Sequence, residues 1–295
     1  MHHAPVRLLL ELSGRFSIVG PLRHARPPEN RILSAARFAA GALVLSAPLL
    51  AQPVITPDAS REGHRADAVF WYTTVAAGVA FALVVAALTV LLARYRRSRS
   101  PKAAYETGAG RGARTLTLAL AGLVFVVIDL NLVRMSKRDM DQYLFAFPSG
   151  PDVVRVEVMP QQWAWNVRYP GPNGVFGDGD DVVALNEVRV PVSRPVMLNL
   201  KSKDVVHSFY VPNFRLKHDA NPGFVTRAWF TATRTGRYEI ACSQVCGWAH
   251  YLMKGTLIVL PEDEWRAWTS DAEADAARRF DPADREAQWG WTWVP

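Results

Sequence analysis

The chain has 295 residues, and 49% of them are hydrophobic, a fraction that is high for a purely soluble protein. Its length allows one or two domains. The formal net charge is +7, but much of the excess lies in an N-terminal leader and in one short loop beside an apolar segment. That distribution is typical of membrane topology. Because the chain has no basic recognition helix, we expect no nucleic-acid partner.

Residues 1–51 are interpreted as a leader. A region rich in arginine precedes the apolar run 38–51, which ends in the small residue Ala51. A basic region, a short apolar run and a small terminal residue together indicate a secretory signal, so we expect cleavage after Ala51. A third membrane helix over 32–51 is the alternative.

Residues 52–138 are expected to form a two-helix membrane hairpin, with spans at about 68–93 and 115–133. The first span is uncharged and long enough to cross a bilayer core of about 30 Å. Seven cationic residues between Arg94 and Arg114 mark the connecting loop as cytoplasmic, which places both outer flanks on the extracytoplasmic side. We therefore expect a multi-pass protein of a bacterial-type inner (cell) membrane. Asp129, the one charge in the second span, is interpreted as an interfacial acid.

From Asp152 onward the pattern changes to short strands separated by turns. Apolar residues alternate over 153–159 with the period of two that is typical of a half-buried strand. Further strands are predicted at 163–169, 182–190, 195–201, 206–211, 224–231, 237–242 and 255–260. This pattern indicates a β-sandwich or barrel over 139–262. In the C-terminal segment 263–295, Pro261 and the acids after it predict a helix that continues to about Arg279.

Residues 171–181 are rich in turn-forming residues and contain Asp178, Asp180 and Asp181. These acids resemble a calcium loop weakly, but their spacing does not fit a twelve-residue calcium-binding loop that ends in glutamate. A solvated hairpin is the favoured interpretation.

The two cysteines of the chain, Cys242 and Cys246, are followed closely by His250 and Met253. Two thiolates, an imidazole and a thioether are soft ligands, which favours copper or zinc over magnesium or calcium. The thioether favours copper, because zinc gains little from it. Thiolates this close together could bridge two metal ions. His207, 35 residues before Cys242, is a further candidate ligand.

Three segments carry a resemblance to a known family: 204–208, 217–223 and the cysteine loop 241–253. Together they resemble subunit II of the haem–copper respiratory oxidases, as in cytochrome c oxidase, the subunit that carries the binuclear CuA centre. The resemblance covers roughly residues 68–262. It implies two transmembrane α-helices followed by an all-β cupredoxin-like Greek-key barrel with a C-terminal helix.

The resemblance also implies a ligand set for two copper ions per chain. The cysteines would bridge the coppers, the histidines would be terminal ligands, the methionine would add a thioether and one backbone carbonyl would complete the set. The implied ligands are His207, Cys242, Gln244, Cys246, His250 and Met253. The family usually has glutamate at the position of Gln244, where the side chain helps to bind magnesium at the contact with subunit I. Glutamine keeps the carbonyl but lacks the anionic oxygen, so the magnesium site is doubtful.

By the same resemblance, the chain would accept electrons from cytochrome c or an equivalent donor and pass them to the haem of oxidase subunit I, where oxygen is reduced to water. Its partners would be subunit I, the other oxidase subunits, the donor and the membrane. The aromatic run at 162–165 matches the family's electron-entry region, and the entry role falls on Trp163. A basic donor would also need acidic docking groups, and the candidates are Asp178, Asp180, Asp181, Glu187 and Asp219.

Three alternatives remain open at the level of sequence. A nitric oxide reductase can use a similar CuA-bearing subunit, and its catalytic partner would distinguish it. A membrane-tethered copper chaperone or sensor would leave a ligand position open. A disulfide-stabilised binding domain would join Cys242 to Cys246 and bind no metal.

Overall fold

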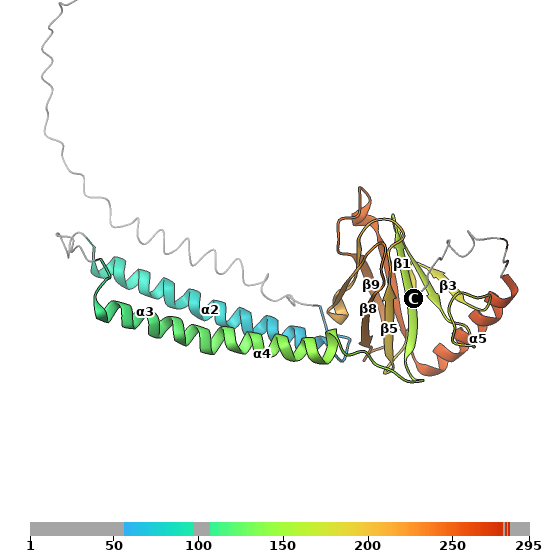
Figure 1. Cartoon of the computed structure of the whole chain (residues 1–295), viewed down its shortest axis with the longest axis horizontal. Helices are drawn as coiled ribbons and strands as arrows, with labels where there is room; N and C mark the ends of the chain where they lie inside the picture. The colour runs from blue at the N-terminus through green and yellow to red at the C-terminus, as the bar shows by residue number, and fades with distance from the viewer. Residues whose placement is uncertain (1–55, 97–106, 280, 282, 284–295) are drawn as a thin grey trace, which may run out of the picture. The chain divides into compact units, whose positions relative to one another are not determined.

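The computed structural model describes residues 56–96, 107–279, 281 and 283. The expected leader 1–51 and the tail after residue 283 lie outside this part of the chain. The described residues form two long helices, a domain of two β-sheets and a C-terminal helix (Figure 1).

The first long helix, α2 (Gly63–Arg94), and a second helical rod are long and apolar enough to cross a membrane. The rod runs from Arg111 to Leu144. It consists of α3 (Arg111–Val124), the π-helical turn η1 (Phe125–Asp129), α4 (Leu130–Asp139) and a second π-helical turn, η2 (Met140–Leu144). Large apolar side chains along both helices are exposed, including Leu92 at 75% and Leu118 at 72%. Apolar surface of this extent needs lipid or another subunit to cover it, and its length and composition are those of membrane-spanning helices.

Contacts between the two helices lie near η1 and near the start of α2. The Tyr72 hydroxyl donates to the carbonyl of Val127, a residue within η1, where the π-helical turn changes the backbone hydrogen-bond pattern. Arg65 donates to Gln142 over 2.9 Å, and its guanidinium lies 3.8 Å from the centre of the Tyr143 ring. The rod extends past the expected span 115–133 to Leu144, and Asp129 is the last residue of η1 within it.

The β-domain consists of two five-stranded sheets. The first has the order β3-β2-β1-β5-β8 and the second β4-β10-β9-β6-β7. Most neighbouring strands are antiparallel, but β1 pairs with β5 and β10 with β4 in parallel. The bounds are β1 (Val154–Gln161), β2 (Ala164–Tyr169), β3 (Val182–Leu185), β4 (Glu187–Pro191), β5 (Pro195–Leu200), β6 (His207–Val211), β7 (Leu216–Ala220), β8 (Thr226–Thr231), β9 (Gly236–Cys242) and β10 (Lys254–Leu260).

The core of this domain lies between the two sheets. Alternate residues of β5 are buried, as expected for a strand with one face inward. Trp165 of β2 and Phe209 of β6 come from different sheets and pack edge to face, with ring centres 5.4 Å apart. Both side chains have no exposed surface. Two sheets packed in this way form a cupredoxin-like β-domain, which confirms the predicted fold class.

Two details differ from the predicted strands. The single strand expected at 182–190 is divided at Asn186, so that β3 belongs to one sheet and β4 to the other. Asn186 has φ of 57°, and its side-chain oxygen accepts a 2.8 Å hydrogen bond from the backbone N–H of Trp165. The second difference is β7, which the pattern did not predict because its sequence contains three charged or ionisable residues in five.

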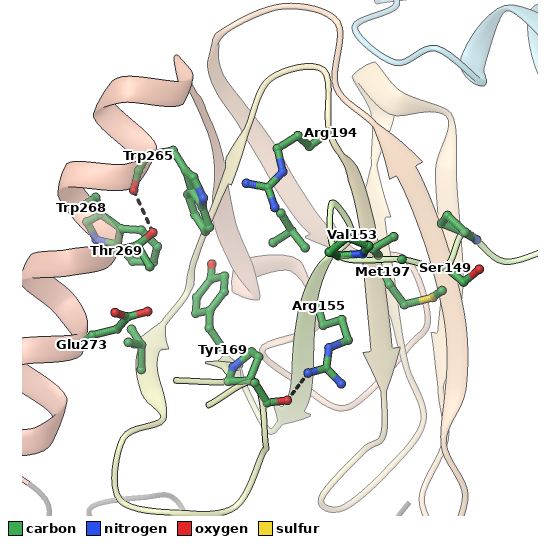
Figure 2. Close-up of a pocket in the computed structure, with 17 residues that line it drawn as sticks. Ser149, Val153, Arg155, Tyr169, Arg194, Met197, Trp265, Trp268, Thr269 and Glu273 are labelled. Carbon is green, nitrogen blue, oxygen red and sulfur yellow. Dashed lines mark hydrogen bonds between the residues drawn. The ribbon is translucent and has the colours of Figure 1, made fainter. Parts of the chain in front are cut away.

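The C-terminal helix α5 (Glu262–Arg279) packs against the β-domain through aromatic residues. Trp265 is buried, and Trp268 contacts Tyr169 with ring centres 5.3 Å apart. A cavity of about 660 Å³ lies between this helix, the start of β1 and the end of β2 (Figure 2). Tyr169, Arg155 and Arg194 are among the residues that line it.

The division at Asn186 predicts a specific mutational result. Asn186→Val should destabilise the β-domain by about 1–3 kcal/mol, because a β-branched residue disfavours positive φ and the hydrogen bond to Trp165 is lost. Thermal unfolding of the purified full chain, followed by circular dichroism, measures this loss. The matched control is Asn186→Gly, which loses the same bond but adopts positive φ freely. Equal midpoints for the two variants would contradict a role for the backbone conformation.

Candidate metal centre

The residues predicted to bind metal meet at one end of the second sheet. His207 is the first residue of β6, Cys242 is the last residue of β9, and Lys254 begins β10 directly after Met253. Because β6 and β9 are neighbours, with Phe209 opposite Cys242, the start of one and the end of the other lie side by side. The remaining candidates lie on the loop 243–253 that joins β9 to β10.

The donor atoms of the six predicted ligands form one continuous cluster. Cys242 Sγ lies 3.7 Å from Cys246 Sγ, 3.9 Å from His207 Nδ1 and 3.2 Å from the carbonyl oxygen of Gln244. Cys246 Sγ lies 3.6 Å from His250 Nδ1 and 3.8 Å from Met253 Sδ. Met253 Sδ is also 3.2 Å from His207 Nδ1.

These separations suit metal ligands and not a disulfide. Both cysteines are free thiols, and a disulfide would bring the two sulfurs to about 2.0 Å. Two sulfurs bound to one ion at about 2.3 Å each can be up to about 4.6 Å apart, which the observed 3.7 Å satisfies. A set of two thiolates, imidazoles and a thioether fits copper. The donor set and its spacing therefore fit the implied copper site.

Backbone and side-chain bonds hold the ligand loop in place at both ends. The N–H of Cys242 donates to the carbonyl of Met253 over 3.1 Å, and the N–H of Ser243 donates to the carbonyl of Ser208 over 3.0 Å. At the middle of the loop, Gln162 Nε2 donates to the carbonyl of Cys246 over 2.8 Å. Gln162 lies between β1 and β2, so the first sheet also helps to fix the loop.

Asp204 positions His207, a role that the sequence pattern did not indicate. Its Oδ1 is 2.8 Å from His207 Nε2, which leaves Nδ1 directed at the cysteines. Burial opposes ionisation of Asp204, but hydrogen bonds from His207 and from the backbone of Gln162 and Val205 hold the pKa of this carboxyl below its usual range. A carboxylate on the outer nitrogen of a metal-binding histidine fixes its tautomer and its ring orientation. The sequence shows only that Asp204 is three residues before His207, and the contact between their side chains arises in the folded chain.

The local electrostatics favour a thiolate at Cys242. Burial alone would raise the pKa of this thiol, but hydrogen bonds from His207 and the backbone of Ser208 lower it to about 6. Burial and the neighbouring Cys242 raise the pKa of Cys246 to about 12. Burial lowers the pKa of His207, yet its bonds to Cys242 and Asp204 outweigh that effect and raise it. Because the thiolate is the ligand form, a bound cation would relieve the repulsion that keeps Cys246 protonated.

Three of the six cluster residues are buried, whereas the loop around them presents an apolar surface. The side chains of His207, Cys246 and Met253 are at most 3% exposed. The neighbouring loop residues have large exposed fractions: Val245 80%, Trp248 77%, Tyr251 69% and Leu252 59%. An exposed apolar patch of this kind next to a buried site is typical of a protein–protein contact.

Trp163 lies between the buried cluster and this apolar surface. Its ring is half-buried and packs edge to face with exposed Trp248, with ring centres 5.2 Å apart. It also contacts Gly247, the residue after Cys246, where an added Cβ would lie 3.1 Å from Trp163 Cζ2. The expected entry residue therefore has contacts to both the surface and the ligand loop.

The acids expected to dock a donor are divided between the two ends of the β-domain. Asp219 is exposed and lies opposite Ser208, next to the cluster. Strand β2 runs from Ala164, at the end of the domain that holds the cluster, to Tyr169 at the opposite end. The loop after Tyr169 carries Asp178, Asp180 and Asp181. These three acids do not belong to the surface around the metal ligands.

Two exposed apolar helices, a cupredoxin-like domain and a His, Cys, Cys, Met cluster define the class: a membrane-anchored copper protein. Residues 176–260 match the family model described as cytochrome c oxidase subunit II, periplasmic domain. The alternative cytochrome c oxidase subunit 2 of Bradyrhizobium diazoefficiens is 31% identical over 239 residues, which cover 72% of this chain and 82% of that relative. The chain therefore belongs to the cytochrome c oxidase subunit II family.

Other comparisons cover a smaller part of the chain. Cytochrome c oxidase subunit 2 of Thermostichus vulcanus is 38% identical over 137 residues, covering 46% of this chain and 38% of that relative. The crystal structure of the periplasmic domain of subunit II of cytochrome oxidase of Bradyrhizobium japonicum is 26% identical, with a TM-score of 0.39. That comparison covers 45% of this chain and 100% of the crystallised one.

The bond between Asp204 and His207 leads to a testable effect on copper affinity. Asp204→Ala should weaken copper binding by about 10- to 100-fold, because the His207 ring loses the carboxylate that orients it. A competition titration of the full chain against a copper chelator measures the change. Asp219→Ala removes an exposed acid from the neighbouring strand and should leave the affinity unchanged. Unaltered affinity in Asp204→Ala would show that His207 needs no such support.

Proposed function

We propose that this chain is the electron-entry subunit of a haem–copper cytochrome c oxidase. It accepts single electrons from cytochrome c, or an equivalent donor, at a binuclear CuA centre and passes them to the haem of subunit I, where oxygen is reduced to water. The observation that carries this proposal is the cluster of six donor groups. Its two sulfurs are 3.7 Å apart, and each sulfur has the Nδ1 atom of a histidine within 4 Å.

The residues hold the centre in assigned roles. Cys242 and Cys246 would supply the two thiolates shared by the copper ions, His207 and His250 an imidazole each, and Met253 Sδ and the carbonyl of Gln244 the remaining donors. When bound, such a centre takes up and releases one electron at a time. We place no magnesium ion beside it, because the Gln244 side chain is exposed and supplies a neutral amide where the family usually has a carboxylate.

The geometry supports an electron relay and not bond chemistry at this site. All the donors assigned to the centre come from the chain, so the assigned set leaves no ligand position for a substrate. A copper chaperone would need such an open position for exchange. A β-domain whose two sheets both fix the ligand loop can hold the donors still, which is what a relay between redox states requires.

The donor is proposed to dock on the apolar surface formed by Val245, Trp248, Tyr251 and Leu252. Trp163 is the proposed entry residue, since it contacts both Trp248 and the backbone beside Cys246. Asp219 is the acid placed to assist a basic donor. Oxidase subunit I and the other oxidase subunits are the proposed partners of the exposed membrane helices.

We place the protein in a bacterial-type inner membrane with the β-domain on the extracytoplasmic side. The support is the set of seven cations from Arg94 to Arg114, which covers the end of α2, the connection and the start of α3. Cationic loops stay on the cytoplasmic side, so the flanks before α2 and after η2 lie outside.

Electron paramagnetic resonance on the copper-loaded full chain tests the binuclear assignment. We expect a mixed-valence spectrum from two coppers sharing one unpaired electron. Cys246→Ser should abolish it, because one bridging sulfur is lost. Gln244→Ala should leave it largely intact, since only a backbone carbonyl is assigned at that position. A spectrum of one isolated copper in the unchanged protein would overturn the proposal.

Electron entry through Trp163 can be tested by rate measurements on the assembled oxidase. Trp163→Phe should slow electron transfer from reduced cytochrome c in a stopped-flow experiment, while the copper spectrum stays unchanged. Trp268→Phe is the matched control, because Trp268 lies on α5 against Tyr169, away from the ligand loop. Unchanged rates in both variants would exclude Trp163 as the entry residue.

A further inference from the structure

The loop between β2 and β3 gathers three carboxylates at the end of the β-domain opposite the copper ligands. One oxygen from each of Asp178, Asp180 and Asp181 lies within 4.8 Å of the other two. Asn173 draws two of them together, since its Nδ2 donates to Asp178 over 2.7 Å and to Asp180 over 3.3 Å. A solvated hairpin would let these like charges separate into water, but here they converge.

Asp181 is the strongest indication that the cluster has a missing partner. Its side chain is only 3% exposed. Oδ2 accepts a 2.7 Å bond from the N–H of Gly177, whereas Oδ1 is buried and has no hydrogen-bond donor among the described residues. The same holds for Oδ1 of Asp178. A buried carboxylate oxygen without a donor is costly, and an absent ion or water is a usual explanation.

The guanidinium of Arg168 contacts both buried acids on this side of the loop. Arg168 lies 3.4 Å from Asp181, but its guanidinium also bonds the buried carboxylate of Glu157 at 2.5 Å. One guanidinium therefore contacts two buried carboxyl groups, and Asp178 and Asp180 add two more carboxyl groups nearby. Burial raises the pKa of Asp181 to about 6, and the effect of Arg168 is too small to cancel it. A positive charge beside Asp181 would remove this penalty.

Two glycines of the loop allow the carboxylates to lie close to its backbone. At Gly171 an added Cβ would collide with Asp180, so the Asp180 carboxylate packs directly on the backbone there. Gly177, whose N–H bonds Asp181, has φ of 96°, a conformation that favours glycine. On the other side, Arg155 donates to the carbonyl of Gly174 and ties the loop to β1 (Figure 2).

We propose that this loop binds one divalent cation of the calcium type through the carboxylates of Asp178, Asp180 and Asp181. Carboxylate oxygens are hard ligands that suit calcium, magnesium or manganese, whereas the sulfur cluster at the other end suits copper. Calcium is favoured over magnesium because it accepts several carboxylates in irregular geometry, whereas magnesium requires a near-ideal octahedron and retains water. The bound cation joins β2 and β3 and stabilises this end of the domain.

Calcium titration of the purified full chain, freed of divalent ions by dialysis against a chelator, tests the proposal. Isothermal calorimetry with CaCl₂ should show one saturable site per chain, and calcium should raise the thermal unfolding midpoint. MgCl₂ should bind at least about tenfold more weakly. Asp178→Asn should weaken calcium binding about tenfold or more, since the carboxylate contributes a charge that sets affinity.

Asp178 is chosen because it is only partly buried, so its substitution spares the buried pair of Asp181 and Arg168. Asp152→Asn is the matched control, an exposed acid outside the loop, and should bind calcium as the unchanged protein does. If Asp178→Asn proves unstable, Asp180→Asn provides the same test. The proposal is overturned if the unchanged protein shows no saturable calcium binding, or if the loop variant and the control bind calcium equally.

Discussion

The separation of two sulfur atoms is the constraint on which the rest of this structure depends. Cys242 Sγ and Cys246 Sγ are held 3.7 Å apart, too far for a disulfide and close enough to share a metal ion. The hydrogen bonds of Cys242 to Met253 and of Ser243 to Ser208 close the ligand loop onto β6 and β10. Gln162 adds a bond from the first sheet, so both sheets of the β-domain support one loop.

The two ends of the β-domain offer opposite ligand chemistries. Sulfur and imidazole donors meet where β6, β9 and β10 begin or end, whereas carboxylates meet on the loop after β2. Soft and hard donors select different ions, so the two sites would not compete. β2 connects them directly, because Trp163 precedes it beside the ligand loop and Tyr169 ends it beside α5. Rigidity at the carboxylate end would therefore support the strand that places Trp163.

The fold class and the ligand cluster could be predicted from the sequence because their signals are local or repeat along the chain. Long uncharged runs, alternating strands and the cysteine spacing need no knowledge of tertiary contacts. The division of 182–190 at Asn186 could not be read in this way, because it depends on a hydrogen bond to Trp165 in another strand. Strand β7 could not be predicted because its sequence is rich in charged residues, and it is a strand only because it pairs with β6. The role of Asp204 and the convergence of the three acids after β2 likewise depend on contacts that arise only in the folded chain.

Copper K-edge X-ray absorption on the copper-replete full chain tests the central claim most directly, because it reports the atoms next to each copper. We predict two coppers per chain, with sulfur and nitrogen bound to each copper and a second copper scattering at short range. Loss of the thiols of Cys242 and Cys246 should remove the copper–copper signal. A single copper per chain without a neighbouring metal, or cysteines joined as a disulfide in the copper-replete protein, would contradict it.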